Sequence, residues 1–158
     1  MLNFRFDLAF TAFSLVSGSV AAGTAISNDI ASCQAGKGPA VLVSVRGLKS
    51  ASGKIRVQSY RATKGAWLSK GAWINRIETS ASSTAMNFCV PVPAAGNYGI
   101  AVRHDRNGNG KTDIRQDGGG FSNNPKLSIL NLGKPSVGNV SFYAGAGVTR
   151  ITINMQYM

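Results

Sequence analysis

The sequence predicts an all-β protein, a two-sheet antiparallel sandwich with a long loop rich in asparagine and glycine. Six segments alternate apolar and polar residues as half-buried strands do, and turn residues join them in pairs. No window has the period of an amphipathic helix, which favours a sandwich. The chain has 158 residues, of which 44% are hydrophobic and 15% charged. These values fit one small globular domain and exclude a disordered chain.

The N-terminal segment, residues 1–22, is predicted to be a secretory signal peptide. Arg5 precedes an apolar run at residues 8–16, and small residues follow up to Ala22. The run is shorter than the roughly 18 residues that a membrane-spanning helix needs, and the small residues mark a cleavage site. We therefore expect cleavage near Ala22, a periplasmic or extracellular location, and no transmembrane helix. The alternative is an apolar N-terminal helix that stays attached.

Two cysteines are expected to form a disulfide. Residues 23–39 are predicted to be an N-terminal arm that carries Cys33, and residues 40–158 the sandwich domain that carries Cys89. An exported protein meets oxidising conditions, and two cysteines allow only one pairing. The alternative is two buried thiols. No CxxC spacing that would indicate a metal site is present.

The six predicted strands are expected to form three hairpins. Val41, Val43 and Val45 illustrate the alternation, since they share one face of the first strand. The expected pairs are residues 40–47 with 53–60 through LKSASG, 84–92 with 97–104 through PAAG, and 139–144 with 148–157 through GAG. These connections contain the glycine, proline and serine that turns favour.

A segment outside these hairpins, residues 61–83, contains the unit KGAW twice. Trp67 and Trp73 alternate with lysine and arginine there, a pattern that can form a stacking surface for a polymer. The alternative, which we favour, is a crossover whose tryptophans close one end of the core, because tryptophan is usually largely buried.

The segment after the fourth predicted strand has the ligand spacing of a calcium-binding loop. Counted from Asp105 as position one, oxygen ligands fall at the places that bind Ca²⁺ in an EF-hand loop, and glycine occupies the sharp turn at position six. Position twelve is Gln116 instead of glutamate, so we expect a weak Ca²⁺ site and no other cofactor. The alternative is a turn closed by its own Asx hydrogen bonds. The candidate ligands are Asp105, Asn107, Asn109, Lys111 through its carbonyl, Asp113 and Asp117, around Gly110.

The sequence shows no complete catalytic constellation. His104 is the only histidine and adjoins Asp105, but acid–base catalysis also requires an aligned partner and a pocket. Ser122 lies in no GxSxG motif, and the GGGF segment at residues 118–121 does not stand between a strand and a helix as a phosphate loop does. The sequence therefore favours a binding module over an enzyme.

Two motifs give the chain a family resemblance. The first is HD-x-N-x-NGK-x-D at residues 104–113, which begins at His104. The second is a GFS-N segment formed by Gly120, Phe121, Ser122 and Asn123. Over residues 40–157 the chain resembles the bacterial domain-of-unknown-function family 2141. The resemblance implies an exported protein with a transthyretin-like, or prealbumin-like, β-sandwich, and it implies no particular activity.

Two functions from different classes follow from these features. The first is a periplasmic or secreted binding or envelope-accessory module, whose basic faces contact anionic envelope polymers or lipid head groups. The net charge of +11 favours it, and export argues against nucleic acid as the partner. The second is a small hydrolase on a transthyretin-like fold, which rests on fold analogy. The chain ends in NMQYM, where the hydrolase of that fold carries a YRGS-type signature.

Overall fold

The computed structural model describes residues 23–128 and 133–158, so the predicted signal peptide lies outside the described residues. None of the helices in this part of the chain has the length and apolarity needed to span a bilayer. In chain order the elements are β1 (Thr24–Ile26), the 3-10 helix η1 (Ile30–Cys33), β2 (Ala40–Arg46), β3 (Lys54–Arg61), β4 (Asn75–Ser80), β5 (Ala85–Pro91), β6 (Gly96–Asp105), β7 (Gly118–Phe121), α1 (Val137–Val140), β8 (Phe142–Ala144), β9 (Val148–Asn154) and β10 (Gln156–Tyr157).

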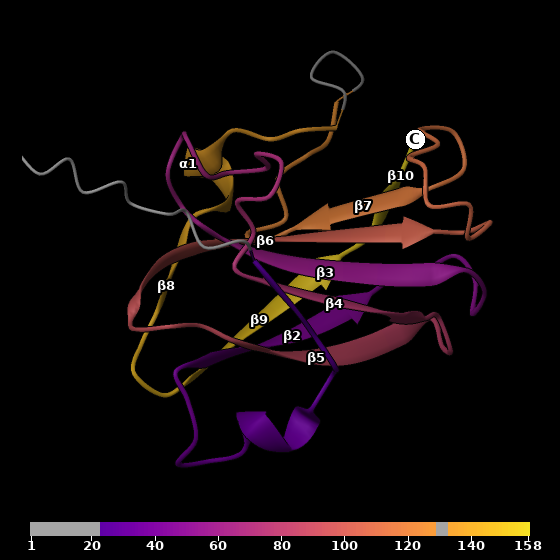
Figure 1. Cartoon of the computed structure of the whole chain (residues 1–158). Coiled ribbons are helices and arrows are strands. Elements are labelled where there is room, and N and C mark those ends of the chain that lie inside the picture. Colours follow the sequence, from indigo (N-terminus) through magenta and orange to yellow (C-terminus); the bar gives the residue numbers. More distant parts are fainter. Residues whose placement is uncertain (1–22, 129–132) are drawn as a thin grey trace, which may run out of the picture.

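These strands form two sheets that stack as two layers (Figure 1). The larger sheet has the order β1-β4-β3-β6-β7-β10, with β8 also paired to β6, and the smaller has the order β5-β2-β9. The all-β class with two sheets is therefore confirmed. Both sheets are mixed, because β1 runs parallel to β4 and β2 parallel to β9, whereas the sequence predicted antiparallel pairing throughout.

Each of the six predicted segments contains a strand, although the segment 139–144 begins in α1 and only Phe142–Ala144 is extended. The three predicted hairpins were wrong. β2 and β3, β5 and β6, and β8 and β9 lie in opposite sheets. Each short connection therefore carries the chain from one layer to the other. The physical reason is that alternation shows only that one face of a strand is buried. That face is buried whether the next strand of the chain pairs beside it in the same sheet or lies in the facing sheet, so the pattern does not distinguish the two arrangements.

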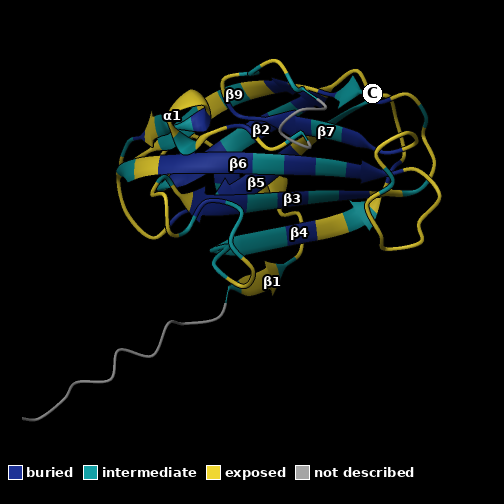
Figure 2. Cartoon of the chain, turned by 90° about the horizontal axis from the view of Figure 1, so that it is seen from above, coloured by how far each residue is buried: buried dark blue, intermediate teal, exposed yellow. Residues whose placement is uncertain are grey.

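The main core lies between the two sheets. Val41, Val43 and Val45 of β2 belong to one apolar cluster with Ile55 and Val57 of β3, and all five are fully buried. Figure 2 shows the corresponding buried stretches along the strands, with exposed residues concentrated in the connecting loops. Burial of this cluster is the main apolar contribution to folding.

A second apolar cluster covers part of the outer face of the larger sheet. Its buried members include Tyr60, Trp67 and Phe121. Trp67 is 9% exposed and makes edge-on ring contacts with Tyr60 and Phe121. The distances between ring centroids are 5.4 Å to Tyr60 and 5.9 Å to Phe121. Its indole N–H donates to the carbonyl of Pro135 at 2.9 Å. Trp67 is thus buried, but it covers a sheet face, and Trp73 is only partly buried. The prediction that both tryptophans close one end of the core was therefore wrong.

The N-terminal arm is fixed to the edge of the smaller sheet. Cys33 and Cys89 form a disulfide, which confirms the predicted pair. Asn28 adds two hydrogen bonds to β5: its Nδ2 donates to the carbonyl of Asn87 at 2.9 Å, and its Oδ1 accepts from the N–H of Cys89 at 3.0 Å. Because β1 also pairs with β4, the arm is attached to both sheets.

Candidate functional site

The loop with the calcium-type spacing joins β6 to β7 at one end of the larger sheet (Figure 1). The two strands pair from Ala101 with Phe121 to His104 with Gly118. The loop therefore closes an antiparallel hairpin, and its first and last residues are held next to each other by strand pairing.

Side-chain oxygens in this loop accept N–H groups of the same loop. Oδ2 of Asp105 accepts from the N–H of Gly110 at 2.8 Å. Oδ1 of Asn107 and Oδ1 of Asn109 each accept the N–H two residues later, at 3.1 Å and 2.7 Å. Gly110 has a φ of +79°, the left-handed conformation that glycine adopts without strain. The two asparagine bonds are the Asx pattern that the sequence predicted as the alternative to a metal site.

Two further carboxylates complete the closure of the loop. Oδ2 of Asp113 accepts from the side-chain amides of Asn107 at 3.0 Å and Asn109 at 2.8 Å. The bond from Asn107 and then that from Asn109 hold the pKa of the Asp113 carboxyl below its ordinary value, because they stabilise the ionised form. Asp117 is buried, and its two oxygens accept the N–H groups of Arg106 at 3.2 Å and Asp113 at 2.9 Å.

A calcium site in this loop requires a different arrangement of its side chains. The amide nitrogens of Asn107 and Asn109 point at Asp113, whereas Ca²⁺ needs amide oxygens. Within residues 23–128 and 133–158, no group of three His, Cys, Asp or Glu side chains is placed to hold a metal ion. Oδ1 of Asp105 is buried without a hydrogen-bond partner. Ca²⁺ binding by Asp105, Asn107, Asn109, Lys111, Asp113 and Asp117 therefore stays a prediction, and it requires both asparagine amides to turn.

His104 lies on the core side of β6 and is fully buried. Its Nε2 is 2.8 Å from the carbonyl oxygen of Ser52, and its Nδ1 is 2.6 Å from the hydroxyl of Tyr157. With the proton assigned to Nε2, the ring donates to Ser52 and accepts from Tyr157, whose oxygen in turn accepts the N–H of Lys49 at 3.0 Å. Both ring nitrogens are thus occupied, and the ring joins β6, β10 and the connection before β3.

The residues of the GFS-N motif attach β7 to its neighbours. Gly120 faces the core, where a Cβ atom would come within 2.7 Å of Ile153, so glycine allows β9 to approach. Ser122 is buried, accepts from a main-chain N–H of β6 at 3.1 Å and donates to the last carbonyl of α1. Asn123 donates to the carbonyl between α1 and β8 at 2.8 Å. The motif therefore has a structural role in positioning β7.

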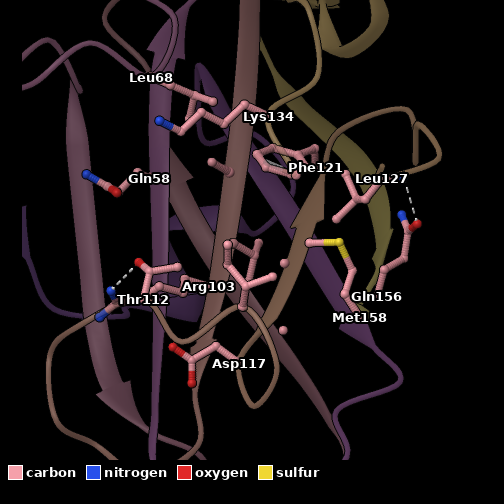
Figure 3. Close-up of a pocket in the computed structure, with 16 residues that line it drawn as sticks. Gln58, Leu68, Arg103, Thr112, Asp117, Phe121, Leu127, Lys134, Gln156 and Met158 are labelled. Atoms are coloured by element: carbon pink, nitrogen blue, oxygen red, sulfur yellow. Dashed lines mark hydrogen bonds between the residues drawn. The ribbon is translucent and has the colours of Figure 1, made fainter. Parts of the chain in front are cut away.

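A pocket of about 250 Å³ lies on the outer face of the larger sheet, beside the loop (Figure 3). Ala101 and Gly119 form part of its lining and carry little or no side chain. Figure 3 shows Phe121 and Leu127 on one side of the pocket and Gln58 on the other. The loop contributes part of the lining through Thr112, Ile114 and Asp117.

Arg103 connects the loop to the sheet within this pocket. Its guanidinium donates to the carbonyl of Gly110 at 3.3 Å, to the hydroxyl of Thr112 at 3.1 Å and to Oδ2 of Asp105 at 3.2 Å. The Nε of Arg103 is buried without a partner. The side chain therefore holds the rim of the pocket in place and retains one unmatched donor.

The pocket was not predicted from the sequence, although small residues gave a signal for it. The outer face of the larger sheet carries Gly99, Ala101 and Gly119. The first two alternate with core-facing residues along β6, and Gly119 pairs with a β6 residue that also points outward. A Cβ atom at Gly99 would come within 2.6 Å of the ring of Trp67, so the tryptophan covers that position. Ala101 and Gly119 remain part of the pocket lining. Small side chains in register on neighbouring strands leave a hollow that no larger side chain fills.

The fold and this site define a class, a mixed two-sheet β-protein with a self-closed Asn/Gly-rich loop and a pocket on one sheet. The family described as "Uncharacterized protein conserved in bacteria (DUF2141)" matches residues 43–152. The chain therefore belongs to this bacterial family, as its two motifs predicted. Comparisons with curated proteins and with solved structures found no match. The transthyretin-like relationship stays a prediction.

Proposed function

We propose that this protein is an exported binding module that holds a small, mainly apolar molecule in the pocket of the larger sheet. The pocket itself carries the proposal, with Ala101 and Gly119 beneath and Phe121 and Leu127 at one side. Small-molecule sites are typically concave and apolar, with a few polar groups that orient the ligand. A volume of about 250 Å³ lies below the roughly 300–1,000 Å³ of sites for drug-sized ligands, so the ligand is small.

The proposed binding site is tested with the neutral apolar dye N-phenyl-1-naphthylamine and a variant that fills the pocket. A Cβ atom at Gly119 would lie 3.4 Å from Leu127, an ordinary contact, so Gly119→Val narrows the pocket without straining the backbone. We expect saturable dye fluorescence with the wild type and at least roughly tenfold weaker binding by Gly119→Val. The matched control is Gly145→Val, since nothing lies within 4 Å of a Cβ atom at Gly145. Equal dye binding by all three proteins would overturn the proposal.

The disulfide supports a location outside the cytoplasm, because disulfides persist in oxidising compartments. Cys33 and Cys89 are both buried, so their bond is part of the packed structure. We propose that residues 1–22 direct export and are removed. In cells that express the full chain, we expect the protein in the periplasm or medium with its N-terminus near Gly23. Retention of the intact chain in the cytoplasm would contradict this.

The environment of His104 supports a binding role over the hydrolase alternative. A general acid or base must reach its substrate, whereas this ring is enclosed and each of its nitrogens has a partner. A hydrolytic activity that is present in the wild type and lost in His104→Ala, with the fold retained, would favour the hydrolase.

The excess of positive charge supports a further contact with an anionic surface of the cell envelope, either a polymer or lipid head groups. The net charge is +11, and such an excess attracts anionic partners at long range. We expect the protein to sediment with phosphatidylglycerol vesicles at low salt and to be released at high salt, since salt screens exposed charges. Binding that does not weaken with salt would contradict the electrostatic mechanism.

A further inference from the structure

We infer that the ligand of this pocket is an aliphatic chain that ends in a carboxylate, such as a medium-chain fatty acid. This inference rests on the proposed binding function and adds the chemistry of the ligand. An apolar lining favours a hydrocarbon chain, and the polar groups that line the pocket decide the nature of its head group.

The unmatched polar side chains of the pocket are hydrogen-bond donors. Lys134 lines the pocket, and its ammonium makes no hydrogen bond or ion pair with any described residue. Arg103 also lines it and has an unpartnered, buried Nε–H. A ligand that supplies an oxygen acceptor would match the Lys134 ammonium, and a carboxylate would make this a charge-assisted hydrogen bond.

Gln58 supplies a third donor. Its amide is assigned with the oxygen toward Arg76, because in that orientation the oxygen accepts from Nη2 at 3.1 Å and Nε at 3.2 Å. The atom drawn as the amide oxygen in Figure 3 is then the nitrogen. The NH₂ group of Gln58 is then the end of the amide that does not bond Arg76, in a residue that lines the pocket.

The acceptor side chains of the pocket are already engaged. Asp117 uses both carboxylate oxygens on main-chain N–H groups. The oxygen of the Gln156 amide accepts from the N–H of Leu127 at 3.1 Å, and its nitrogen donates to a main-chain carbonyl at 2.9 Å. Asp117 also lies at the end of the pocket away from Lys134 in Figure 3. These groups therefore offer little to a cationic head group.

The positions of these residues give the ligand an orientation. In Figure 3, the side chain of Lys134 extends over the pocket toward the side of Gln58, whereas Phe121, Leu127 and Met158 lie on the opposite side. The carboxylate would lie between Lys134 and Gln58, on the side of β3. The hydrocarbon chain would lie against the apolar side chains beside β7.

The experiment compares three probes with the same ten-carbon chain: decanoate, 1-decanol and decyltrimethylammonium. Each is titrated, below the concentration at which it aggregates, against the protein loaded with N-phenyl-1-naphthylamine. We expect decanoate to displace the dye with roughly tenfold higher affinity than decanol, because a charge-assisted hydrogen bond is added, and decyltrimethylammonium to bind most weakly. Isothermal titration calorimetry gives the same affinities without the dye.

The charge variant Lys134→Gln is expected to remove most of the preference for decanoate over decanol. Its matched control is Lys126→Gln, at an exposed position outside the pocket lining, which should keep the preference. Both changes are at the surface, so loss of folding does not obscure the result. Equal binding of decanoate and decanol, tighter binding of the cation, or an unchanged preference in Lys134→Gln would overturn the carboxylate assignment and retain the pocket. Failure of the dye and of all three probes to bind would overturn both proposals.

Discussion

Replacing Cys33 and Cys89 together by alanine is expected to lower the free energy of unfolding by about 4 kcal/mol. The two residues are 56 positions apart, and loop-closure entropy for a cross-link of that span amounts to roughly 4 kcal/mol at 25 °C. In a domain of this size such a loss corresponds to a fall in Tm of roughly 10–15 °C. Urea unfolding of the double variant, followed by tryptophan fluorescence, measures the difference from the oxidised wild type.

The reduced wild type is the matched control for this experiment. The reduced protein lacks the cross-link but keeps both sulfur atoms. The difference between its free energy of unfolding and that of the double variant therefore isolates the effect of the packing change at the two sites. A loss of less than about 1 kcal/mol on reduction would refute the entropic reasoning. It would mean that the unfolded chain keeps enough residual structure to restrict the arm without the cross-link.

Three further predictions concern the loop and the cluster around His104. Tyr157→Phe leaves Nδ1 of the buried His104 without its hydroxyl partner and should lower the unfolding free energy by about 1–3 kcal/mol in urea titrations, whereas Tyr143→Phe, at a 65% exposed position, should change it little. Burial raises the pKa of the Tyr157 hydroxyl, so the unfolded chain loses this proton first. Stability should therefore fall as the pH rises above about 10, and less steeply in Tyr157→Phe; identical slopes would contradict this. Millimolar Ca²⁺ is expected to raise the Tm of the wild type but not of Asp105→Asn, and an unchanged wild-type Tm would leave the loop as a turn.

The sequence predicted those features in which side chains follow a local pattern. The alternation of Val41, Val43 and Val45 placed β2 correctly, and the same reasoning placed β3, β5, β6, β8 and β9. The oxidising context predicted the disulfide that the structure contains. The spacing from Asp105 to Asp117 located the loop, because alternate oxygen-bearing residues in a glycine-rich segment favour a compact turn whether or not a metal is bound.

The remaining features depend on contacts between distant segments. β7 is formed by GGGF and β4 by NRIETS, neither of which alternates apolar and polar side chains. These strands exist because β6 and β3 present edges that pair with them. The pocket was equally hidden, since it arises where Ala101 and Gly119 lack large side chains on neighbouring strands. Such a hollow becomes visible only when the register of the strands is known.

The loop and the pocket are connected through Arg103, so the self-closed loop would support the proposed binding site. The guanidinium bonds to Asp105, Gly110 and Thr112, so the hydrogen bonds that close the loop also fix one wall of the pocket. Since the pKa of the Asp113 carboxyl is lowered, the carboxylate that accepts from Asn107 and Asn109 stays ionised to a lower pH than an unperturbed aspartate would.

The uneven charge of the chain follows from the same arrangement. Each of the five acidic residues after residue 22 has an internal partner: one caps η1, one pairs with an arginine of β3, and three accept hydrogen bonds in or beside the loop. They are Asp29, Glu78, Asp105, Asp113 and Asp117. The acids thus serve to hold the structure, while Lys134 and other basic residues face outward without a carboxylate nearby. A surface with this excess of positive charge would attract the proposed anionic ligand before any specific contact forms.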